Sequence, residues 1–310
     1  MKPQPNRADH FWFRTLLWIG CFALLPLWGQ THLDEEPVGT RALRDSQGRA
    51  LANQDHAWWL NFLREAEVVA EKPIGGGITN PLKLTLRHEG REINAIFRHL
   101  FRYERNVKVE GDLHPYFFDS YKFEVAAYTL AQLLELDRIP PVIYAEYKGR
   151  KGSLQVWIEN ARTEKKRRDK KIAFPGHYPE TYEYQQMLFF DLLVWNFDRH
   201  EGNFLYDTQW CLWYIDHTRT FRADPKLHKP ERLTRVPRKL WERFTALTKK
   251  DFNQALKPHL NAMQLHMFHQ RRKRLTRYVT ERISTHGESA VLLEEPNEPP
   301  QGTANADAGN

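Results

Sequence analysis

The spacing of apolar residues changes about halfway along this 310-residue chain, and that change limits the folds it can adopt. Before residue 160 the apolar residues fall mostly in short runs that alternate with polar ones, a pattern typical of half-buried strands. After residue 180 the spacing is mostly helical, and Tyr182–Trp195 is apolar on a wide face, as in a buried helix. Strands followed by helices predict an α+β fold of two lobes, with the crevice between them as the natural ligand site.

The individual elements follow from the same periodicities and from turn and capping residues. Ala57–Ala70 has helical spacing, and the pair Asp119-Ser120 is a good cap for a second helix at Tyr121–Leu136. Helical spacing returns between residues 238 and 283. The predicted strands are Pro81–His88, Ile93–Arg98, Val142–Tyr147 and Ser153–Ile158, followed by the short runs Phe204–Tyr206 and Trp210–Ile215.

The amino-terminal end carries a hydrophobic segment. Thr15–Trp28 holds fourteen residues without a charge, and Lys2, Arg7 and Arg14 precede it, which fits a secretory signal. Because no clean A-x-A-like cleavage site follows, we expect a signal anchor that is uncleaved or poorly cleaved; a cleaved signal peptide and a buried helix are the alternatives. The protein is therefore expected to be membrane-associated or exported, with the side of the membrane left open.

Charge is uneven along the chain. The net charge is +7, yet the last 23 residues, from Glu288 onward, hold five acids and no Lys or Arg, so we expect a disordered acidic tail there. Arg162–Lys171 holds seven bases and two acids and reads as a solvated loop, with contact to an anionic membrane as an alternative. No aromatic residues alternate with these bases, so nucleic acid is not an expected partner.

Composition narrows the class further. Hydrophobic residues make up 41% of the chain, enough for a sizeable core, while Cys21 and Cys211 are the only cysteines and exclude a disulfide framework or a Cys-based zinc site. The predicted segments are residues 1–30 (signal anchor or signal peptide), 31–66 (lead-in segment with a helix), 67–161 (β-rich lobe), 162–178 (basic loop), 179–286 (helical lobe) and 287–310 (tail).

Two motifs in the second half carry the chemical signal. NFDRHEGNF places Asp198 five positions before Asn203, and YIDHTRTF places Asp216 thirteen positions after Asn203. The first interval equals that between the Asp and the Asn of the catalytic loop H-R-D-x-x-x-x-N. Phosphoryl transfer needs a carboxylate to receive the proton of a hydroxyl, and it needs oxygen ligands for Mg²⁺. These three residues therefore predict a phosphotransferase site.

At these motifs the chain resembles the atypical kinases that share a DRH-x-x-N loop. That group includes the phosphatidylinositol 3- and 4-kinases, the HipA toxin kinases, and the secretory group of Golgi casein kinase and four-jointed. The resemblance covers roughly residues 68–221. It implies a bilobal protein-kinase-like fold, here preceded by a hydrophobic amino-terminal helix, with ATP and Mg²⁺ (or Mn²⁺) bound between the lobes. It also implies transfer of the γ-phosphoryl group to a hydroxyl of a protein, lipid or small molecule.

Carried onto this sequence, the resemblance implies a role for each matching residue. Asp198 would be the catalytic base, Asn203 and Asp216 the metal ligands, and His200 a residue that shapes the loop or touches the transferring phosphate. Glu124, on the predicted helix, would hold the cation that contacts the phosphates. The glycine triplet Gly75, Gly76 and Gly77 would cover the ATP phosphates, and Trp157–Asn160 would line the adenine slot.

The cationic side chain expected beside Glu124 departs from the kinase pattern. Where these kinases carry Lys in a motif such as A-I-F-K, this chain has Arg98. An arginine stays charged and can bind Glu124 and a phosphate together, but its head is larger and planar. Lys83 on the preceding strand is a second candidate for the missing ammonium, and the sequence does not choose between them.

Two other functions are compatible with the same residues. The replacement at Arg98 leaves open a nucleotide-binding pseudokinase or scaffold. A metal-dependent phosphohydrolase could use Asp198, His200, Asp216 and His217 around one ion, although such sites usually hold more His or carboxylate ligands.

Overall fold

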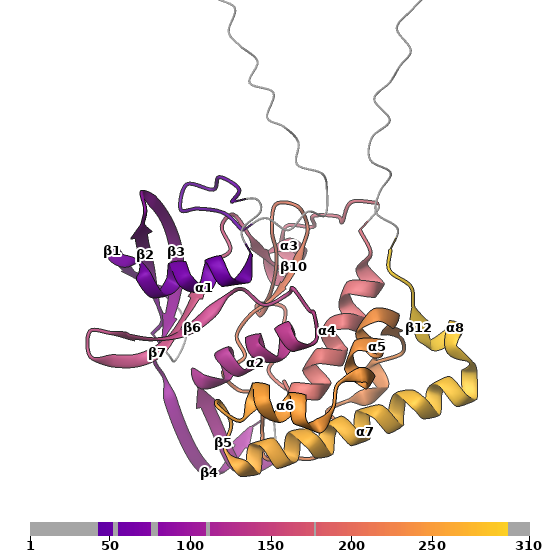
Figure 1. Cartoon of the computed structure of the whole chain (residues 1–310). Helices are drawn as coiled ribbons and strands as arrows, with labels where there is room; N and C mark the ends of the chain where they lie inside the picture. Colours follow the sequence, from indigo (N-terminus) through magenta and orange to yellow (C-terminus); the bar gives the residue numbers. More distant parts are fainter. Residues whose placement is uncertain (1–42, 52–54, 76–79, 110–111, 177, 297–310) are drawn as a thin grey trace, which may run out of the picture. The chain divides into compact units, whose positions relative to one another are not determined.

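The computed structural model describes residues 43–51, 55–75, 80–109, 112–176 and 178–296 (Figure 1). The strands are β1 (Glu67–Pro73), β2 (Leu82–His88), β3 (Arg91–Arg98), β4 (Phe101–Val109), β5 (Asp112–Ser120), β6 (Val142–Tyr147), β7 (Arg150–Val156), β8 (Arg162–Thr163), β9 (Phe204–Tyr206), β10 (Leu212–Tyr214), β11 (Val236–Pro237) and β12 (Leu292–Leu293). The helices are α1 (His56–Glu65), α2 (Lys122–Leu133), α3 (Glu164–Asp169), α4 (Glu180–Val194), α5 (Arg238–Ala246), α6 (Lys249–Leu256), α7 (Ala262–His286), α8 (Glu288–Val291) and a 3-10 turn, η1 (Pro230–Arg232).

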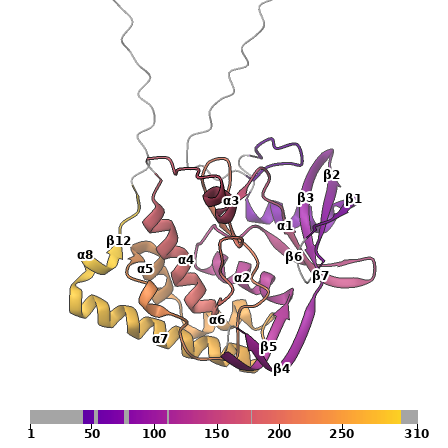
Figure 2. The same cartoon turned by 180° about the vertical axis from the view of Figure 1, so that it is seen from behind.

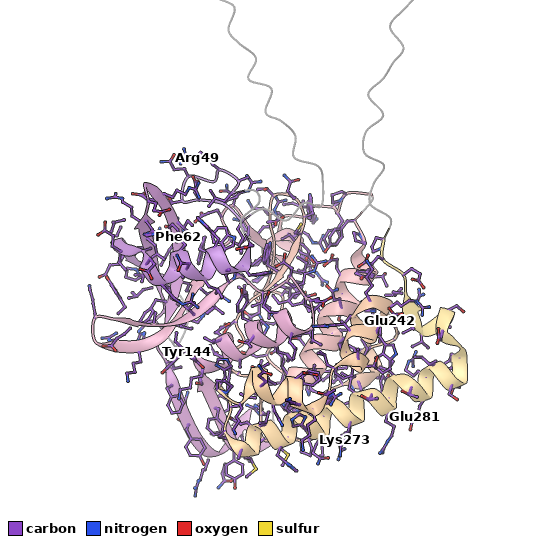
Figure 3. The ribbon with its side chains drawn as sticks, in the orientation of Figure 1. Arg49, Phe62, Tyr144, Glu242, Lys273 and Glu281 are labelled. Atoms are coloured by element: carbon purple, nitrogen blue, oxygen red, sulfur yellow. The ribbon has the colours of Figure 1, made fainter. Side chains whose placement is uncertain are left out.

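A five-stranded antiparallel sheet in the order β1-β2-β3-β7-β6 forms the first layer. Alternation in β2 buries Leu84 and Leu86 on one face, as the sequence pattern predicts. Helix α1 begins at the cap Asp55, whose carboxylate accepts the N–H of Trp58, and it lies against β2, β6 and β7. Phe62 of α1 packs into the core beneath the helix (Figure 3).

Helix α2 connects the sheet to the helical part of the chain. It lies against β6 and β7 on one side and against α6 on another (Figure 1). The side chains of residues 123–128 are all buried, including that of Glu124, which is 0% exposed. A helix buried around most of its circumference cannot shift without disturbing both layers, so it holds Glu124 rigidly.

A second and larger core is formed by the helices. Helix α4 lies against α7 and β11, and its buried residues include Phe189, Phe190 and Leu193. Helices α6 and α7 each begin with a capping box, Thr248 with Asp251 and Asn261 with Gln264, which satisfies backbone donors at both starts.

The predicted elements are largely present, with differences that have local causes. The lead-in helix ends at Glu65 rather than at residue 70, because Ala66 is already extended and β1 then pairs with β2. The charged hairpin of β4 and β5 was not predicted. The helix α2 starts after Tyr121: Ser120 Oγ accepts the N–H of Lys122, whereas Asp119 binds an arginine far along the chain and does not cap.

Two predictions of irregular structure were wrong. The basic segment is not simply a loop: it contains β8 and the short helix α3, which Figure 2 shows. Helix α3 contacts β8 and β9. Thr163 caps α3, and the buried Glu164 binds Arg167 and Arg168, so the bases are organised by one acid. The predicted acidic tail also starts too early, because residues 288–293 form α8 and β12, and β12 pairs in parallel with β11.

Other predictions fall on parts of the chain that are not described. The hydrophobic segment Thr15–Trp28 lies outside the described residues, as do the last fourteen residues and Gly76 and Gly77. Among the residues that are described, every helix is too short or too polar to cross a bilayer.

Candidate functional site

The hairpin of β9 and β10 brings the two predicted metal ligands together. Tyr214 pairs with Phe204, so Asn203 directly precedes one strand and Asp216 follows the other by two positions at the same end. The N–H of Ile215 donates to the carbonyl of Asn203 at 3.2 Å, which extends the pairing by one step beyond the strands. Short antiparallel pairing therefore juxtaposes residues that are thirteen positions apart.

The loop before β9 is held by a buried arginine. Helix α4 ends at the left-handed residue Trp195, and the guanidinium of Arg199 then binds both carboxylate oxygens of Asp191 at 2.9 and 3.0 Å. The same side chain donates to the carbonyls of Asn203 and Ile215. Arg199 thus ties the loop to α4 and to the hairpin. The sequence alone gave no role to Arg199, although its place inside the motif NFDRHEGNF was the available signal.

Two further hydrogen bonds orient the candidate base and the candidate ligand. The N–H of Asp198 donates to Asn196 Oδ1 at 3.2 Å, and Asn203 Nδ2 donates to the carbonyl of Asp198 at 2.9 Å. Because the amide nitrogen of Asn203 is engaged in this way, its Oδ1 is the atom that a cation could take.

The carboxylate of Asp198 lies in a mixed electrostatic environment. Burial raises its pKa, and the nearby charge of Asp216 raises it further, while Arg219 opposes both. Arg219 Nη1 lies 3.0 Å from Asp198 Oδ2, and Arg219 Nε lies 2.8 Å from Asp119 Oδ2 at the end of β5. A cation bound near both carboxylates would offset the effect of Asp216 on Asp198.

Asp216 has an unusual backbone conformation, with φ at 61°. Left-handed conformations are uncommon for residues other than glycine, and they cluster at functional sites when the surrounding structure holds them. Here Thr218 Oγ1 donates to Asp216 Oδ1 at 3.2 Å, and the carbonyl of Thr218 accepts the N–H of Ser120. Asn203 and Asp216 supply oxygen donors, which suit Mg²⁺ or Mn²⁺.

Glu124 and Arg98 form the buried ion pair that the resemblance implied, with 3.6 Å between Arg98 Nε and Glu124 Oε1. Arg98 Nη1 also donates to Gln155 Oε1 at 3.1 Å. Glu124 Oε1 accepts the backbone N–H of His217, the residue after Asp216. Burial alone would raise the pKa of Glu124, but Arg98 and His217 together hold it below its usual value. Glu124 therefore joins the predicted phosphate-binding strand to the segment of Asp216, the predicted metal ligand.

His217 is not available as a metal ligand. Its ring is fully buried, with Nδ1 3.6 Å from Glu124 Oε2 and Nε2 3.1 Å from Arg199 Nη2. Across the described parts of the chain, no group of three or more His, Cys, Asp or Glu side chains is placed to share an ion. The hydrolase arrangement that combined Asp198, His200, Asp216 and His217 is therefore not assembled.

Lys83 belongs to a different cluster from Arg98. Its Nζ lies 3.3 Å from Glu159 Oε1 and 4.6 Å from the centre of the Trp157 ring. Asn94 Nδ2 also donates to Glu159 Oε1, at 2.7 Å. The residues predicted to line the adenine slot thus hold Lys83, while Arg98 holds the position beside Glu124. Gly75 is exposed at the end of the segment that follows β1.

His200 lies at the exposed edge of the loop. Its Nδ1 accepts the N–H of Gly202 at 3.0 Å, so a neutral His200 ring carries its proton on Nε2. A methyl group at Gly202 would come within 2.8 Å of the His200 ring, so a glycine at this position leaves the ring room to lie over the loop.

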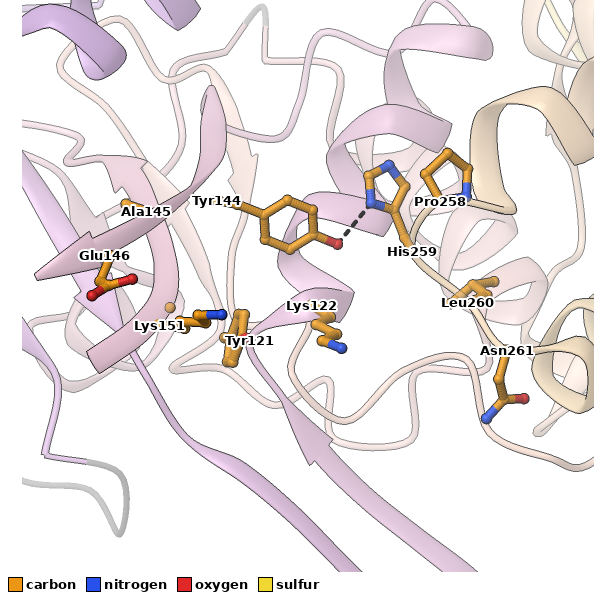
Figure 4. A pocket seen from close by; sticks show the side chains of 11 residues that line it. Tyr121, Lys122, Tyr144, Ala145, Glu146, Lys151, Pro258, His259, Leu260 and Asn261 are labelled. Atoms are coloured by element: carbon orange, nitrogen blue, oxygen red, sulfur yellow. Dashed lines mark hydrogen bonds between the residues drawn. The ribbon is translucent and has the colours of Figure 1, made fainter. Parts of the chain in front are cut away.

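Two cavities are relevant to ligand binding. One, of about 450 Å³, touches Asp198 and His200. Another, of about 620 Å³, lies away from the candidate site between the β6–β7 hairpin, the start of α2 and the loop before α7 (Figure 4). In it Tyr144 Oη lies 2.7 Å from His259 Nδ1, and burial raises the pKa of Tyr144 to about 12.

The chain has a mixed α/β, kinase-like fold. In this fold the helix α2, which carries Glu124, connects an antiparallel sheet to a helical lobe that includes the loop after α4 and the β9–β10 hairpin. Among solved structures, a hydra Fam20 structure with sugar matches with a TM-score of 0.60 and 16% identity, over 82% of this chain and 96% of that one. A Golgi casein kinase with Mn/ADP bound matches with a TM-score of 0.56 and 13% identity, over 79% and 81% of the two chains. No protein-family model and no curated protein matches the sequence. At these identities the likeness establishes the fold.

Proposed function

We propose that this chain is an ATP-dependent phosphotransferase that uses a divalent cation and transfers the γ-phosphoryl group to a hydroxyl of a protein, lipid or small molecule. The observation that carries the proposal is the placement of Asp198, Asn203 and Asp216 at one end of the β9–β10 hairpin, next to the Arg98–Glu124 ion pair. The kinase-like fold supports it, and one solved structure with this fold holds Mn/ADP.

Each residue has a role that its contacts support. Asp198 would accept the proton of the acceptor hydroxyl as the hydroxyl oxygen bonds to the γ-phosphorus and the bridging oxygen leaves with ADP. Asn203 Oδ1 and the Asp216 carboxylate would hold Mg²⁺ or Mn²⁺, which when bound neutralises phosphate charge. Arg98, oriented by Glu124, would contact the phosphates. His200, at the exposed edge of the loop, would shape the loop or contact the transferring phosphate.

The nucleotide would lie between these residues and the sheet. Gly75, Gly76 and Gly77 would approach the phosphates through their backbone, as residues without a side chain can. Trp157–Asn160 would line the adenine slot, with Lys83 held there by Glu159. We also propose that the amino-terminal apolar segment tethers the protein to a membrane or directs its export.

The test is phosphate transfer by the purified full chain with labelled ATP and Mg²⁺ or Mn²⁺. We expect Asp198→Asn to lower the rate by about 10²–10⁴ while ATP still binds. Asp216→Asn should in addition lose the cation-dependent part of nucleotide binding. The matched control is Asp224→Asn, a carboxylate on the following segment that caps a turn through Lys226. Transfer that survives Asp198→Asn within a few-fold would exclude this assignment.

A second function, a nucleotide-binding pseudokinase or scaffold, is favoured by two contacts. Arg98 stands where related kinases carry Lys, and it is already engaged by Glu124 and Gln155. Arg219 also occupies the carboxylate of Asp198. Thermal stabilisation by ATP and Mg²⁺ without transfer to any acceptor would support this function. Transfer that appears in Arg98→Lys would then place the defect at that side chain.

A further inference from the structure

The cavity of about 450 Å³ beside the candidate base is built from three segments. Helix α4 forms one wall, the loop of residues 196–201 forms the second, and residues 228–233 form the third. Both Asp198 and His200 line it, so the cavity adjoins the residue proposed as the base. This volume falls at the lower end of the range for small-molecule sites and would hold a compound about the size of a sugar phosphate.

Most charges around this cavity neutralise one another. Asp191 binds the buried Arg199, and Glu201 Oε1 lies 2.8 Å from Arg168 Nη1. Asp198 is bound by Arg219, which approaches from outside the cavity lining. The acids in the wall are therefore each matched by a cation.

Two cations remain in the third wall. Lys229 is exposed and makes no ion pair with any described residue. Arg232 is also exposed and donates to Tyr184 Oη, a neutral group, so its charge is not neutralised within the described chain. Lys229 has a left-handed backbone with φ at 52° and begins the η1 turn that carries Arg232, so the turn sets both cations on one rim of the cavity.

We propose that this cavity binds the acceptor, and that the acceptor is a small hydroxyl compound bearing a phosphate group. This inference rests on the proposed function and adds the substrate class. The phosphate would bind Lys229 and Arg232, since an arginine and a lysine together give directed hydrogen bonds and charge. A hydroxyl of the same compound would then lie at Asp198. Its oxygen bonds to the γ-phosphorus of ATP, its proton passes to Asp198, and ADP leaves.

His200 also lines the cavity, on the wall formed by residues 196–201. Because its Nδ1 accepts the Gly202 N–H, Nε2–H of a neutral ring is free to donate to a hydroxyl or phosphate oxygen in the cavity. The cavity thus presents donors from two of its walls, and Asp198 contributes a carboxylate acceptor. An uncharged polyol would leave Lys229 and Arg232 without a partner and should bind much more weakly.

The experiment measures binding and transfer separately, with the full chain. Binding of glucose 6-phosphate, inorganic phosphate and glucose is followed by titration calorimetry without ATP, and transfer from labelled ATP is followed with each sugar. We expect glucose 6-phosphate to bind, inorganic phosphate to compete with it, and glucose to bind at least about tenfold more weakly. Lys229→Ala with Arg232→Ala should weaken glucose 6-phosphate binding by about tenfold or more. Lys226→Ala, an exposed lysine outside the cavity, is the matched control and should stay within about twofold.

The outcomes separate this inference from the proposed function. Suppose that glucose 6-phosphate binding depends on its phosphate group and is lost in the double variant, but that the protein shows no transfer. This result would support the phosphate-binding cavity and contradict the proposed phosphotransferase function. Transfer to acceptors without regard to their phosphate group, or glucose 6-phosphate binding unchanged in the double variant, would overturn the inference and leave the phosphotransferase standing. Absence of binding by both phosphate probes, with ATP binding intact, would also overturn it. Vesicles of anionic lipid serve as a third probe, and a preference for them over the soluble phosphate would contradict a small acceptor.

Discussion

Arg219 joins Asp198 to Asp119, with 3.0 Å to the carboxylate at the candidate base and 2.8 Å to the one at the end of β5. One guanidinium therefore links the loop after α4 to the hairpin of β4 and β5. The contact also favours the ionised form of Asp198, because Arg219 lowers the pKa of this carboxyl more than any other charge does. The effect of Arg219 on Asp198 can be tested through the pH dependence of phosphate transfer.

Removing Arg219 should shift the acidic limb of the pH–rate profile. Burial and Asp216 raise the pKa of Asp198, and Arg219 lowers it, so Arg219→Gln should raise that pKa further. A base is active only when it is ionised, so the limb of kcat/KM should move to higher pH. The measurement is the pH profile of transfer beside Lys226→Gln, which removes a nearby exposed cation. An unshifted limb would show that Asp198 is not the titrating group.

Asp198→Asn should separate stability from activity. Because the pKa of Asp198 is raised in the folded state, that state binds the proton more tightly than the unfolded chain does. Its ionisation therefore costs folding free energy as pH rises above the unfolded value. The Asn variant avoids this cost, so its Tm should gain on that of the wild type as pH rises from about 4 through the folded pKa of Asp198, while transfer is lost. A constant difference in Tm across this range would contradict the expected sign.

Removing only one charge of the Arg98–Glu124 pair should lower the free energy of unfolding strongly. Glu124 is 0% exposed, and Glu124→Gln leaves Arg98 with an uncompensated buried charge, so we expect a loss of about 3–5 kcal/mol in the free energy of unfolding. Urea unfolding followed by tryptophan fluorescence measures it. Because the folded pKa of Glu124 lies below its usual value, the wild-type advantage is present above about pH 4.5 and is lost as pH falls through the folded pKa.

A double variant tests whether this effect belongs to the pair. Arg98→Met with Glu124→Gln removes both charges, so its loss of stability should be smaller than the sum of the two single losses. Glu135→Gln, whose side chain is 68% exposed just beyond α2, is the control and should change stability by no more than about 0.5 kcal/mol. Additive losses would mean that the two side chains stabilise the fold independently.

The segment after α7 should contribute to stability despite its acidic composition. Leu292 is 3% exposed, it pairs with Val236 in the parallel strands β12 and β11, and its carbonyl accepts Arg235 Nη2. Leu292→Ala should lower the free energy of unfolding by about 2–5 kcal/mol, because it leaves a cavity in the helical core. Ser289→Ala, an exposed change in the same segment, should have little effect. Equal stability of the two variants in urea would show that β12 is dispensable.

The order of the elements could be predicted because burial leaves a periodic trace in the sequence. The strands around Leu84 and Leu86 and the helix α4 follow their expected periods. The hairpin β4–β5 was missed because β4 has no buried face: residues 101–108 are all exposed or half-buried. The helix α3 was missed because all of its residues are charged. In α3 the decisive partner is the single buried acid Glu164, which composition does not distinguish from a solvated one.

The sequence allowed the residues of the candidate site to be predicted, but not the contacts that hold them in place. The spacing of Asp198, Asn203 and Asp216 indicated oxygen ligands and a base, and the pairing of β9 with β10 brings two of them together. The ion-pair partners of Arg199 and Arg219 could not be read from the sequence. Each depends on a partner from another element, Asp191 on α4 and Asp119 on β5.

The sequence by itself determined the two-lobed α+β plan and the kinds of side chain available for chemistry, because both depend on local periodicity and residue type. Only the tertiary structure decided which ions pair. Arg98 rather than Lys83 lies beside Glu124, His217 is buried, and Arg219 holds the carboxylate of Asp198. The physical reason is that a charge–charge contact depends on distances of a few ångströms across the fold, and segments remote in sequence reach such distances only after packing.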